Sequence, residues 1–495
     1  MFNIATIFSN ILKIDTIQRQ SIIALFWQIA FTAIGFLSTM YFAHTVGAAI
    51  LGSYFLFLAY YGITSMFMDG GFGGAAIKRI SEGEEPDAYF SAYFMLRLVF
   101  TITGVLILLL LKDYFSDLNG SGMFVWLLVA LLVSMVVGPI STGVSGQGKM
   151  GIRNTCEGIS NILRVILQVL AIYFGYETGG LAGGMVAGMI GAAIIEFQFF
   201  DLHFAPFKWD HIKSLSVFSF WLFLTTSGAL VFSQADTVLI GYFMDTEDVG
   251  IYRIALQFTS VATFSSYAIR STLWPRISQW GKANEIYLIE ESLARAISYS
   301  LLLAIPVFVG GVLLGDHLLN SFYGPEFVQG YYTFVILLAV QIVNVFQYFF
   351  TMYLDGLNYP KESFKVTAIG VGANILLNII LIPFMGINGA AIATLATMTL
   401  NALLAWQVLS KYMVIRLELS CLLNIVAASV IMGLLIGLYR FLFMPLSNIL
   451  FTVIPVIFGA LIYGFLVLKL DRKVCDEMRH IVERVGIGFI WPDWL

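Results

Sequence analysis

The sequence predicts an all-α polytopic membrane protein with about 14 transmembrane helices. Of its 495 residues, 59% are hydrophobic and only 11% are charged, whereas a soluble domain carries about 25% charged residues. Apolar runs of about 20 residues, the length that a helix needs to cross a bilayer, recur along the whole chain. Short sequence motifs of the first half recur in the second half, which indicates an internal duplication.

Fourteen stretches are apolar enough to be spans, with boundaries uncertain by a few residues. They cover about 22–43, 50–68, 88–111, 122–144, 155–175, 180–200, 216–243, 250–274, 296–316, 330–354, 363–384, 388–410, 420–443 and 449–469. The segments before and after them, 1–21 and 471–495, carry apolar residues at helical spacing beside lysine and arginine. That pattern is typical of a helix lying in the headgroup plane.

The distribution of lysine and arginine predicts the orientation. On the predicted topology, twenty of the 26 lie on the side of the N-terminus and only Lys112 and Arg440 lie on the opposite side; the other four fall within spans. Because positive charge is retained in the cytoplasm, both termini are expected there. The expected location is the cell (plasma or inner) membrane.

The duplication covers the first twelve spans. Gly146-Gln147-Gly148 returns at Gly356-Leu357-Asn358 with an offset of 210, and Leu181-Ala182-Gly183 returns at Ile387-Asn388-Gly389 with an offset of 206. The expected architecture is two six-helix lobes, related by this repeat and facing a central cavity, plus two C-terminal helices. The predicted divisions are an interfacial segment (1–21), an N-lobe (22–205), a C-lobe (206–412), spans thirteen and fourteen (413–470) and a cytoplasmic amphipathic tail (471–495).

Several function classes are disfavoured by the sequence. A net charge of only −4 argues against nucleic acid as a partner. No residues are spaced as metal ligands or as a cofactor motif, so neither is expected. The longest cytoplasmic loops, around 70–88, 201–215 and 275–295, are too small for a catalytic domain. A transporter is therefore expected rather than an enzyme.

Arginines inside predicted spans are the candidate binding residues, since each charge costs about 2.5–3.5 kcal/mol at the bilayer centre. Arg97 lies in span three on a face with Tyr93 and Thr101, Arg164 lies in span five, and Arg153 lies at its cytoplasmic mouth. Three arginines can bind a phosphate or pyrophosphate bidentately. The alternative is that they pair with acidic residues of the same lobe. Those acidic residues are Glu157 and Glu196.

Two aspartates and three further basic residues complete the candidate site. Asp236, within span seven, can pair with an arginine, bind a cation or take up a proton, and is assigned to coupling or gating. Asp69, before Gly70-Gly71, either caps that helix end or acts as a hinge for gating. Arg270 either snorkels to the interface or binds substrate in the cavity. Lys361 and Lys365 mark the cytoplasmic mouth.

These marks resemble the multidrug/oligosaccharidyl-lipid/polysaccharide exporter superfamily, and specifically its polysaccharide (O-antigen type) flippase branch. The resemblance runs from about residue 20 to 410, with short motifs in the same order. The matching motifs are Gly47-x4-Gly52-x-Tyr54, Asp69-Gly70-Gly71, Asp236 with Val249-Gly250-x-Tyr252, Gly356-x-Asn358, and Gly386-Ile387-Asn388-Gly389-Ala390-Ala391.

The resemblance implies a flippase that moves an isoprenoid-phosphate- or pyrophosphate-linked oligosaccharide from the inner to the outer leaflet by alternating access, for cell-surface glycan synthesis. Its partners would be this lipid-linked oligosaccharide, membrane lipids and a coupling ion such as H+ or Na+. Two alternatives stay open: an ion-coupled drug or cation antiporter of the same superfamily, and a membrane-embedded glycan polymerase.

Overall fold

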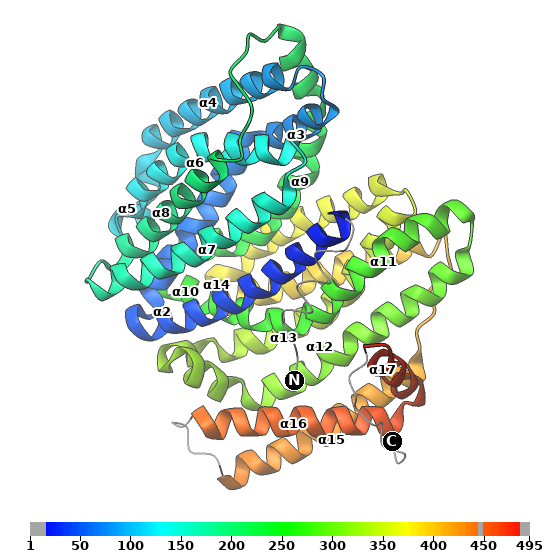
Figure 1. Cartoon of the computed structure of the whole chain (residues 1–495). Helices are drawn as coiled ribbons and strands as arrows, with labels where there is room; N and C mark the ends of the chain where they lie inside the picture. The colour runs from blue at the N-terminus through cyan, green and yellow to red at the C-terminus, as the bar shows by residue number, and fades with distance from the viewer. Residues whose placement is uncertain (1–15, 444–448, 486–495) are drawn as a thin grey trace. The chain divides into compact units, whose positions relative to one another are not determined.

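The structure, a computed structural model, describes residues 16–443 and 449–485, and every regular element in those ranges is a helix (Figure 1). The predicted interfacial segment at 1–21 therefore lies mostly outside the described residues, as does the end of the tail. The helices of the first half are α2 (Thr16–Asp69), α3 (Phe72–Glu82), α4 (Pro86–Leu110), α5 (Ser116–Gly120), α6 (Met123–Gly146), α7 (Met150–Tyr173), α8 (Glu177–Phe197) and α9 (Trp209–Phe243). Those of the second half are α10 (Thr246–Thr259), α11 (Phe264–Ala283), α12 (Ile286–Tyr323), α13 (Tyr331–Gly356), α14 (Pro360–Leu409), α15 (Leu419–Phe443), α16 (Ile449–Leu470) and α17 (Arg472–Val485).

The helices account for the fourteen predicted spans. α2 and α14 each supply two because each bends at one glycine, Gly47 with φ 78° and Gly386 with φ 58°. α10 and α11 together supply one, and nine other long helices of the described chain supply one each. The prediction of an all-α protein with about 14 spans is confirmed.

The bend at Gly386 closes a helical hairpin without a loop. A positive φ is readily adopted only by glycine, which has no Cβ. The two halves of α14 then lie so close that a Cβ added to Gly389 would stand 2.4 Å from the Leu381 carbonyl oxygen. Asn374 Nδ2 bridges the halves by donating to the hydroxyls of Thr394 and Thr397, both at 3.4 Å.

α7 and α8 form a second close pair, side by side in Figure 1. Cβ atoms added to Gly180, Gly184 and Gly188 would stand 2.8, 2.5 and 2.9 Å from side-chain atoms of α7. The α7 residues concerned are Ala171, Gln168 and Arg164. Packing is the main attraction between helices in lipid, and small residues let it act at short range.

Span eight is broken, although the hydropathy pattern predicts one continuous helix. Between α10 and α11 lies a 3₁₀ turn, η2 (Ser260–Thr263). The hydroxyls of Thr259, Ser260 and Thr263 each donate to the carbonyl three residues earlier, at 2.6 to 2.8 Å. Hydroxyls that bond to the backbone in this way compete with the regular helical pattern and favour a local change of pitch.

By contacts, the chain divides into two compact units, Met1–Gly250 and Ile251–Leu495. In the first unit, α9 packs against α2, α3 and α4. In the second unit, α15 and α16 pack against α12, and Arg440 of α15 pairs with Asp316 of α12 at 2.6 Å. The division into lobes at residue 206 rests on the repeat and stays a prediction.

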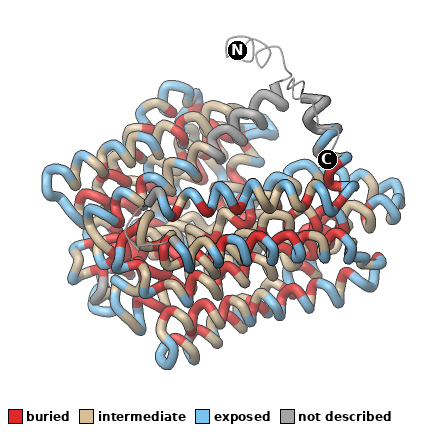
Figure 2. The backbone as a smooth tube through the Cα atoms, turned by 90° about the horizontal axis from the view of Figure 1, so that it is seen from below, coloured by how far each residue is buried: buried red, intermediate tan, exposed pale blue. Residues whose placement is uncertain are grey.

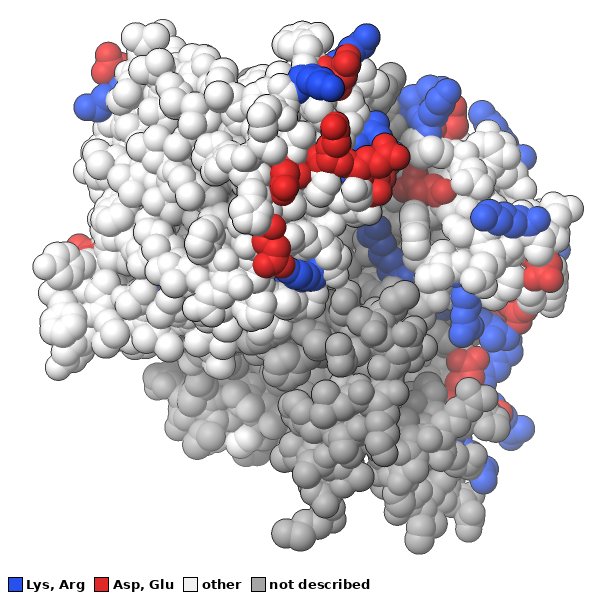
Figure 3. All heavy atoms as spheres, turned by 45° about the horizontal axis from the view of Figure 1, so that its top comes forward, with Lys and Arg blue, Asp and Glu red and all other residues white. Residues whose placement is uncertain are grey.

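Most helices bury one side and expose the other. Buried and exposed residues alternate along them in Figure 2. The exposed side is largely apolar, and broad areas of the face in Figure 3 carry no charged side chain. An apolar exterior of this kind suits a lipid surrounding.

Two glycines of α14 offer a matched test of the close hairpin. Gly389→Ala should lower the free energy of unfolding by at least about 1–3 kcal/mol, because its methyl group would overlap the Leu381 backbone. Gly372→Ala on the same helix meets nothing within 4 Å and should be neutral or stabilising by about 0.4–1 kcal/mol. Unfolding in detergent micelles measures both, and equal effects would contradict the close approach.

Candidate polar site in the membrane

The centre of the candidate site is an ion pair between α4 and the end of α2. Arg97 Nη1 lies 2.9 Å from Asp69 Oδ1. The Arg97 side chain is only 6% exposed, whereas that of Asp69 is 27% exposed. A guanidinium so deeply placed requires an anionic or polar partner, and the end of α2 provides it.

Asp69 also fixes the turn that follows α2. Gly70 and Gly71 have φ values of 56° and 78°, which turn the chain into α3. The Gly73 backbone N–H then donates to Asp69 Oδ2 at 3.2 Å, and the Tyr93 hydroxyl of α4 donates to Oδ1 at 3.0 Å. One carboxylate therefore holds α2, α3 and α4 together.

The cluster extends to α6. Arg97 Nη2 donates to Ser134 Oγ at 3.5 Å and to Ser65 Oγ of α2 at 3.2 Å. Thr142 of α6 donates to the Tyr93 hydroxyl oxygen at 3.5 Å. Arg97 Nε remains a buried donor without a partner among the described residues. An unpaired buried donor costs about 1–3 kcal/mol, so this cluster is not arranged for stability alone.

Arg153 and Arg164 lie on one face of α7, because their separation of eleven residues is close to three helical turns. Both are half-buried. Arg153 interacts electrostatically with Glu196, which is buried at the end of α8 and accepts a hydrogen bond from Ser141. Arg164 Nε is buried and has no partner in the described part of the chain.

The repeat gives the position of Arg164 a counterpart. The offset of 210 aligns Arg164 with Asn374 and Gln168 with Asn378. Gln168, Asn374 and Asn378 are buried amides that hydrogen-bond within their own hairpin or to the adjacent helix. Arg164 packs its Cβ on Gly188 at the equivalent place but carries a positive charge that the hairpin does not use.

Asp236 lies on α9 in the same unit. It is 8% exposed and is engaged in a polar interaction. Its neighbour Thr237 is fully buried. The structure thus confirms burial, while the assignment of Asp236 to coupling stays a prediction.

The remaining candidates belong to the second unit. Arg270 of α11 donates to the Tyr348 hydroxyl at 3.0 Å and lies 5.1 Å from the Tyr348 ring and 5.5 Å from the Trp274 ring. Such aromatic contacts hold a cation while leaving it accessible. Lys361 and Lys365 are exposed at the start of α14, where Lys365 pairs with Glu362 at 2.7 Å.

The structure therefore brings together Arg97 and Asp69, which the sequence treats as separate substrate-binding and gating residues. Of the predicted alternatives for pairing, Glu196 is near Arg153, and Arg97 uses neither Glu157 nor Glu196 but Asp69. Sequence reasoning places Tyr93 on the face of Arg97 but misses Ser65, Ser134 and Thr142. A hydroxyl in a helix carries no signal of its own, since it commonly bonds to the turn before it.

The chain matches a known family over more than half its length. Residues 42–330 match the polysaccharide biosynthesis protein family. The chain belongs to this family. The predicted resemblance to polysaccharide flippases agrees with this family.

Two relatives from Haloferax volcanii cover nearly the whole chain. "Probable low-salt glycan biosynthesis flippase Agl15" is 29% identical over 457 residues, 91% of this chain and 96% of that protein. "Probable flippase AglR" is 26% identical over 464 residues, 91% of this chain and 95% of that protein.

Two solved structures share the fold. The lipid II flippase MurJ in an inward closed conformation has a TM-score of 0.73 at 18% identity, with 92% of this chain and 100% of that one covered. An inward-facing MATE family multidrug resistance transporter of the MOP superfamily has a TM-score of 0.62 at 14% identity, with 77% and 96% covered. At these identities the likeness concerns the fold.

The ion pair predicts unequal costs for its two halves. Asp69→Asn leaves the buried Arg97 guanidinium without a counter-charge and should cost about 3–5 kcal/mol of unfolding free energy. Arg97→Met leaves a partly exposed carboxylate that Tyr93 and Gly73 still bind, and should cost less, about 1–3 kcal/mol. The double variant should be more stable than Asp69→Asn.

Unfolding in detergent micelles measures these differences. Glu291→Gln is the control, because its pair with Arg295 is an exposed pair one helical turn apart and should be worth under about 1 kcal/mol. A larger loss of unfolding free energy for Arg97→Met than for Asp69→Asn would contradict the role of Asp69 as the counter-charge of the buried Arg97.

Proposed function

We propose that the protein is a flippase that moves a lipid-linked oligosaccharide, joined through isoprenoid phosphate or pyrophosphate, from the inner to the outer leaflet by alternating access. It would serve the synthesis of a cell-surface polysaccharide or glycan. The family and the named flippases among the relatives support this class of substrate. The fold is shared with the lipid II flippase MurJ and is compatible with transport of a lipid.

The observation that carries the proposal is the unused charge of Arg164. A buried guanidinium nitrogen without a partner among the described residues is costly on a membrane-spanning helix, and the predicted repeat aligns an asparagine, Asn374, with this position. Arg164 and Arg153, on one face of α7, would bind the phosphate or pyrophosphate of the substrate, because guanidinium groups bind phosphate oxygens bidentately.

Arg97 and Asp69 would act as an exchangeable pair. A phosphate is an oxyanion like the Asp69 carboxylate and can replace it on Arg97. Release of Asp69 would loosen its hydrogen bonds to Gly73 of α3 and Tyr93 of α4. Substrate arrival would then be coupled to a change between α2, α3 and α4, which is the gating role expected of Asp69.

We also propose roles for the other candidate residues. Asp236 would couple transport to H+ or Na+, and Arg270, with its aromatic neighbours, would contact substrate in the second half. Lys361 and Lys365 would attract anionic headgroups at the cytoplasmic mouth. Location in the cell membrane with both termini in the cytoplasm rests on the lysine and arginine distribution.

The test is flipping of a fluorescent lipid-linked oligosaccharide by the purified protein in liposomes. Its arrival in the outer leaflet is followed with a membrane-impermeant quencher. No acceleration for any lipid-linked oligosaccharide, together with ion-driven export of a soluble cation, would point to a drug or cation antiporter instead. Extension of glycan chains by the purified protein would point to a polymerase.

Replacement of Arg164 should lower the rate of flipping without changing the stability of the fold. Arg164→Ala should slow flipping by about 10- to 100-fold, the loss of a charge-assisted contact worth about 1.5–3 kcal/mol. Its thermal unfolding should match that of the parent. Arg416→Ala, which removes an exposed arginine between α14 and α15, should leave both unchanged. Loss of stability without loss of flipping would make Arg164 a structural residue.

A further inference from the structure

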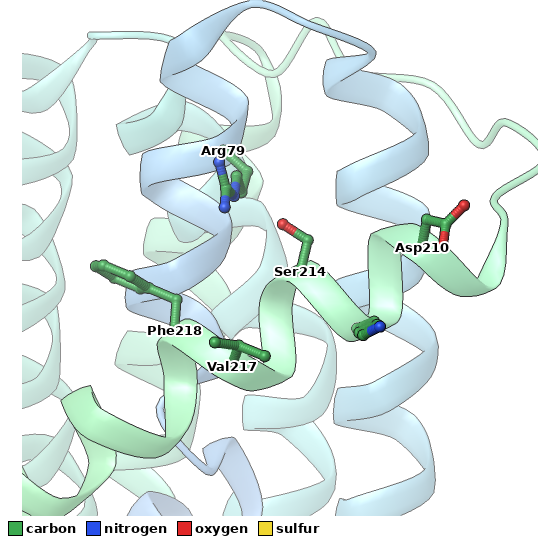
Figure 4. Close-up of a pocket in the computed structure, with 6 residues that line it drawn as sticks. Arg79, Asp210, Ser214, Val217 and Phe218 are labelled. Carbon is green, nitrogen blue, oxygen red and sulfur yellow. The ribbon is translucent and has the colours of Figure 1, made fainter.

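A pocket of about 440 Å³ lies between α3 and the first turns of α9, apart from the buried arginine cluster (Figure 4). The lysine and arginine distribution assigns this end of the helices to the cytoplasmic side. Its lining is part polar and part apolar: Arg79, Asp210, Lys213, Ser214, Val217 and Phe218.

The lining of α9 changes character along the helix. Its five residues stand at positions i, i+3, i+4, i+7 and i+8 and so share one face. Asp210, Lys213 and Ser214 come first, and Val217 and Phe218 follow one turn later, about 5 Å deeper by the helical pitch. Trp209, exposed at the start of α9, is typical of the membrane interface. This face of α9 therefore extends from the depth of the lipid headgroups to the depth of the acyl chains.

Three residues with hydrogen-bond donors, Arg79, Lys213 and Ser214, line the polar end of the pocket. Arg79 pairs through Nη1 with Glu82 at 2.7 Å, but its Nε is buried and has no partner among the described residues. Lys213 and Ser214 likewise make no side-chain hydrogen bond or ion pair in residues 16–443 and 449–485. Figure 4 shows Ser214 facing Arg79 across the pocket.

The apolar end is held open to the surface. Val217 is 63% exposed. Lys78 lies over the Phe218 ring, 4.4 Å from its centroid, and adds a further positive charge beside the pocket. Asp210 is the opposing charge, and in Figure 4 its carboxylate lies at the far end of the pocket from Arg79.

The two walls are fixed by close packing. A Cβ added to Gly71 would stand 2.7 Å from the Ser219 carbonyl oxygen of α9, and one added to Gly74 would stand 2.2 Å from a Leu222 methyl carbon. Leu215 of α9 is buried in the same hydrophobic cluster as Ala75 and Ile80 of α3. The two helices that carry the donors are thus held in place before any ligand arrives, which reduces the entropy lost on binding.

We propose that this pocket binds the phosphate headgroup of an anionic membrane lipid of the cytoplasmic leaflet. Arg79 and Lys213 neutralise the phosphate, Ser214 donates to one of its oxygens, and the first part of the acyl chain lies on Val217 and Phe218. A phosphate provides the acceptors that the three donors lack, and an attached chain covers the exposed apolar surface. The site does not depend on the proposed transport activity.

The test is titration of the full-length protein in detergent with phosphatidic acid, counted as bound lipid by native mass spectrometry. Arg79→Ala with Lys213→Ala should weaken the tightest binding at least ten-fold. The matched control, Lys411→Ala with Arg416→Ala, removes two exposed basic residues elsewhere and should change it less than two-fold. Equal losses in both double variants would overturn a specific site.

A second variant guards against a trivial loss through misfolding. Asp210→Asn removes the one carboxylate among the described residues that line the pocket and should strengthen phosphatidic acid binding several-fold, a gain that misfolding cannot produce. Weaker or unchanged binding would contradict the assigned geometry. Equally tight binding of phosphatidylcholine, or full displacement by inorganic phosphate at equal concentration, would overturn the assignment to an anionic lipid. Because no glycan is used, the outcome is independent of whether the protein flips one.

Discussion

Direct backbone approach between neighbouring helices is the constraint on which the rest of this structure depends. Lipid tails are as apolar as the side chains they would displace, so helices in a bilayer gain little from hydrophobic burial and must gain from packing. The glycines of α8 and the second half of α14 bring helix axes close enough for that gain. Close approach also lets short polar side chains reach across, as Gln168 and Asn374 do.

The hydropathy of the sequence is sufficient to predict the span count, since each helix that crosses a bilayer needs about 20 mainly apolar residues. The reversals at Gly47 and Gly386 fall in the gaps that the pattern leaves. Two features escape it. The break between α10 and α11 depends on hydroxyls bonding to their own backbone. The Asp69–Arg97 pair depends on how α4 is rotated against α2, which no periodicity in either helix records.

Within the candidate site, the residue types are predictable and their partnerships are not. A charged residue in a predicted span is easily recognised in the sequence. Placing it in the bilayer costs free energy, which a partner or a ligand must offset. Whether the charged residue pairs within the protein or binds a ligand depends on side chains that lie tens of residues away in the sequence. Arg97 forms an ion pair with Asp69, whereas Arg164 forms no ion pair within the described residues. The predicted repeat aligns Arg164 with Asn374, which packs within its helical hairpin without a charge. The comparison therefore indicates that packing alone does not require an arginine at this position.

The single-residue reversal in α14 has a consequence for biogenesis. Only Gly386 interrupts the helical backbone between the two packed halves of α14, so no loop separates them. Buried hydrogen bonds from Asn374 to Thr394 and Thr397 join the halves instead. We expect both halves to enter lipid together, because either half alone would expose these polar side chains to the bilayer without their partners.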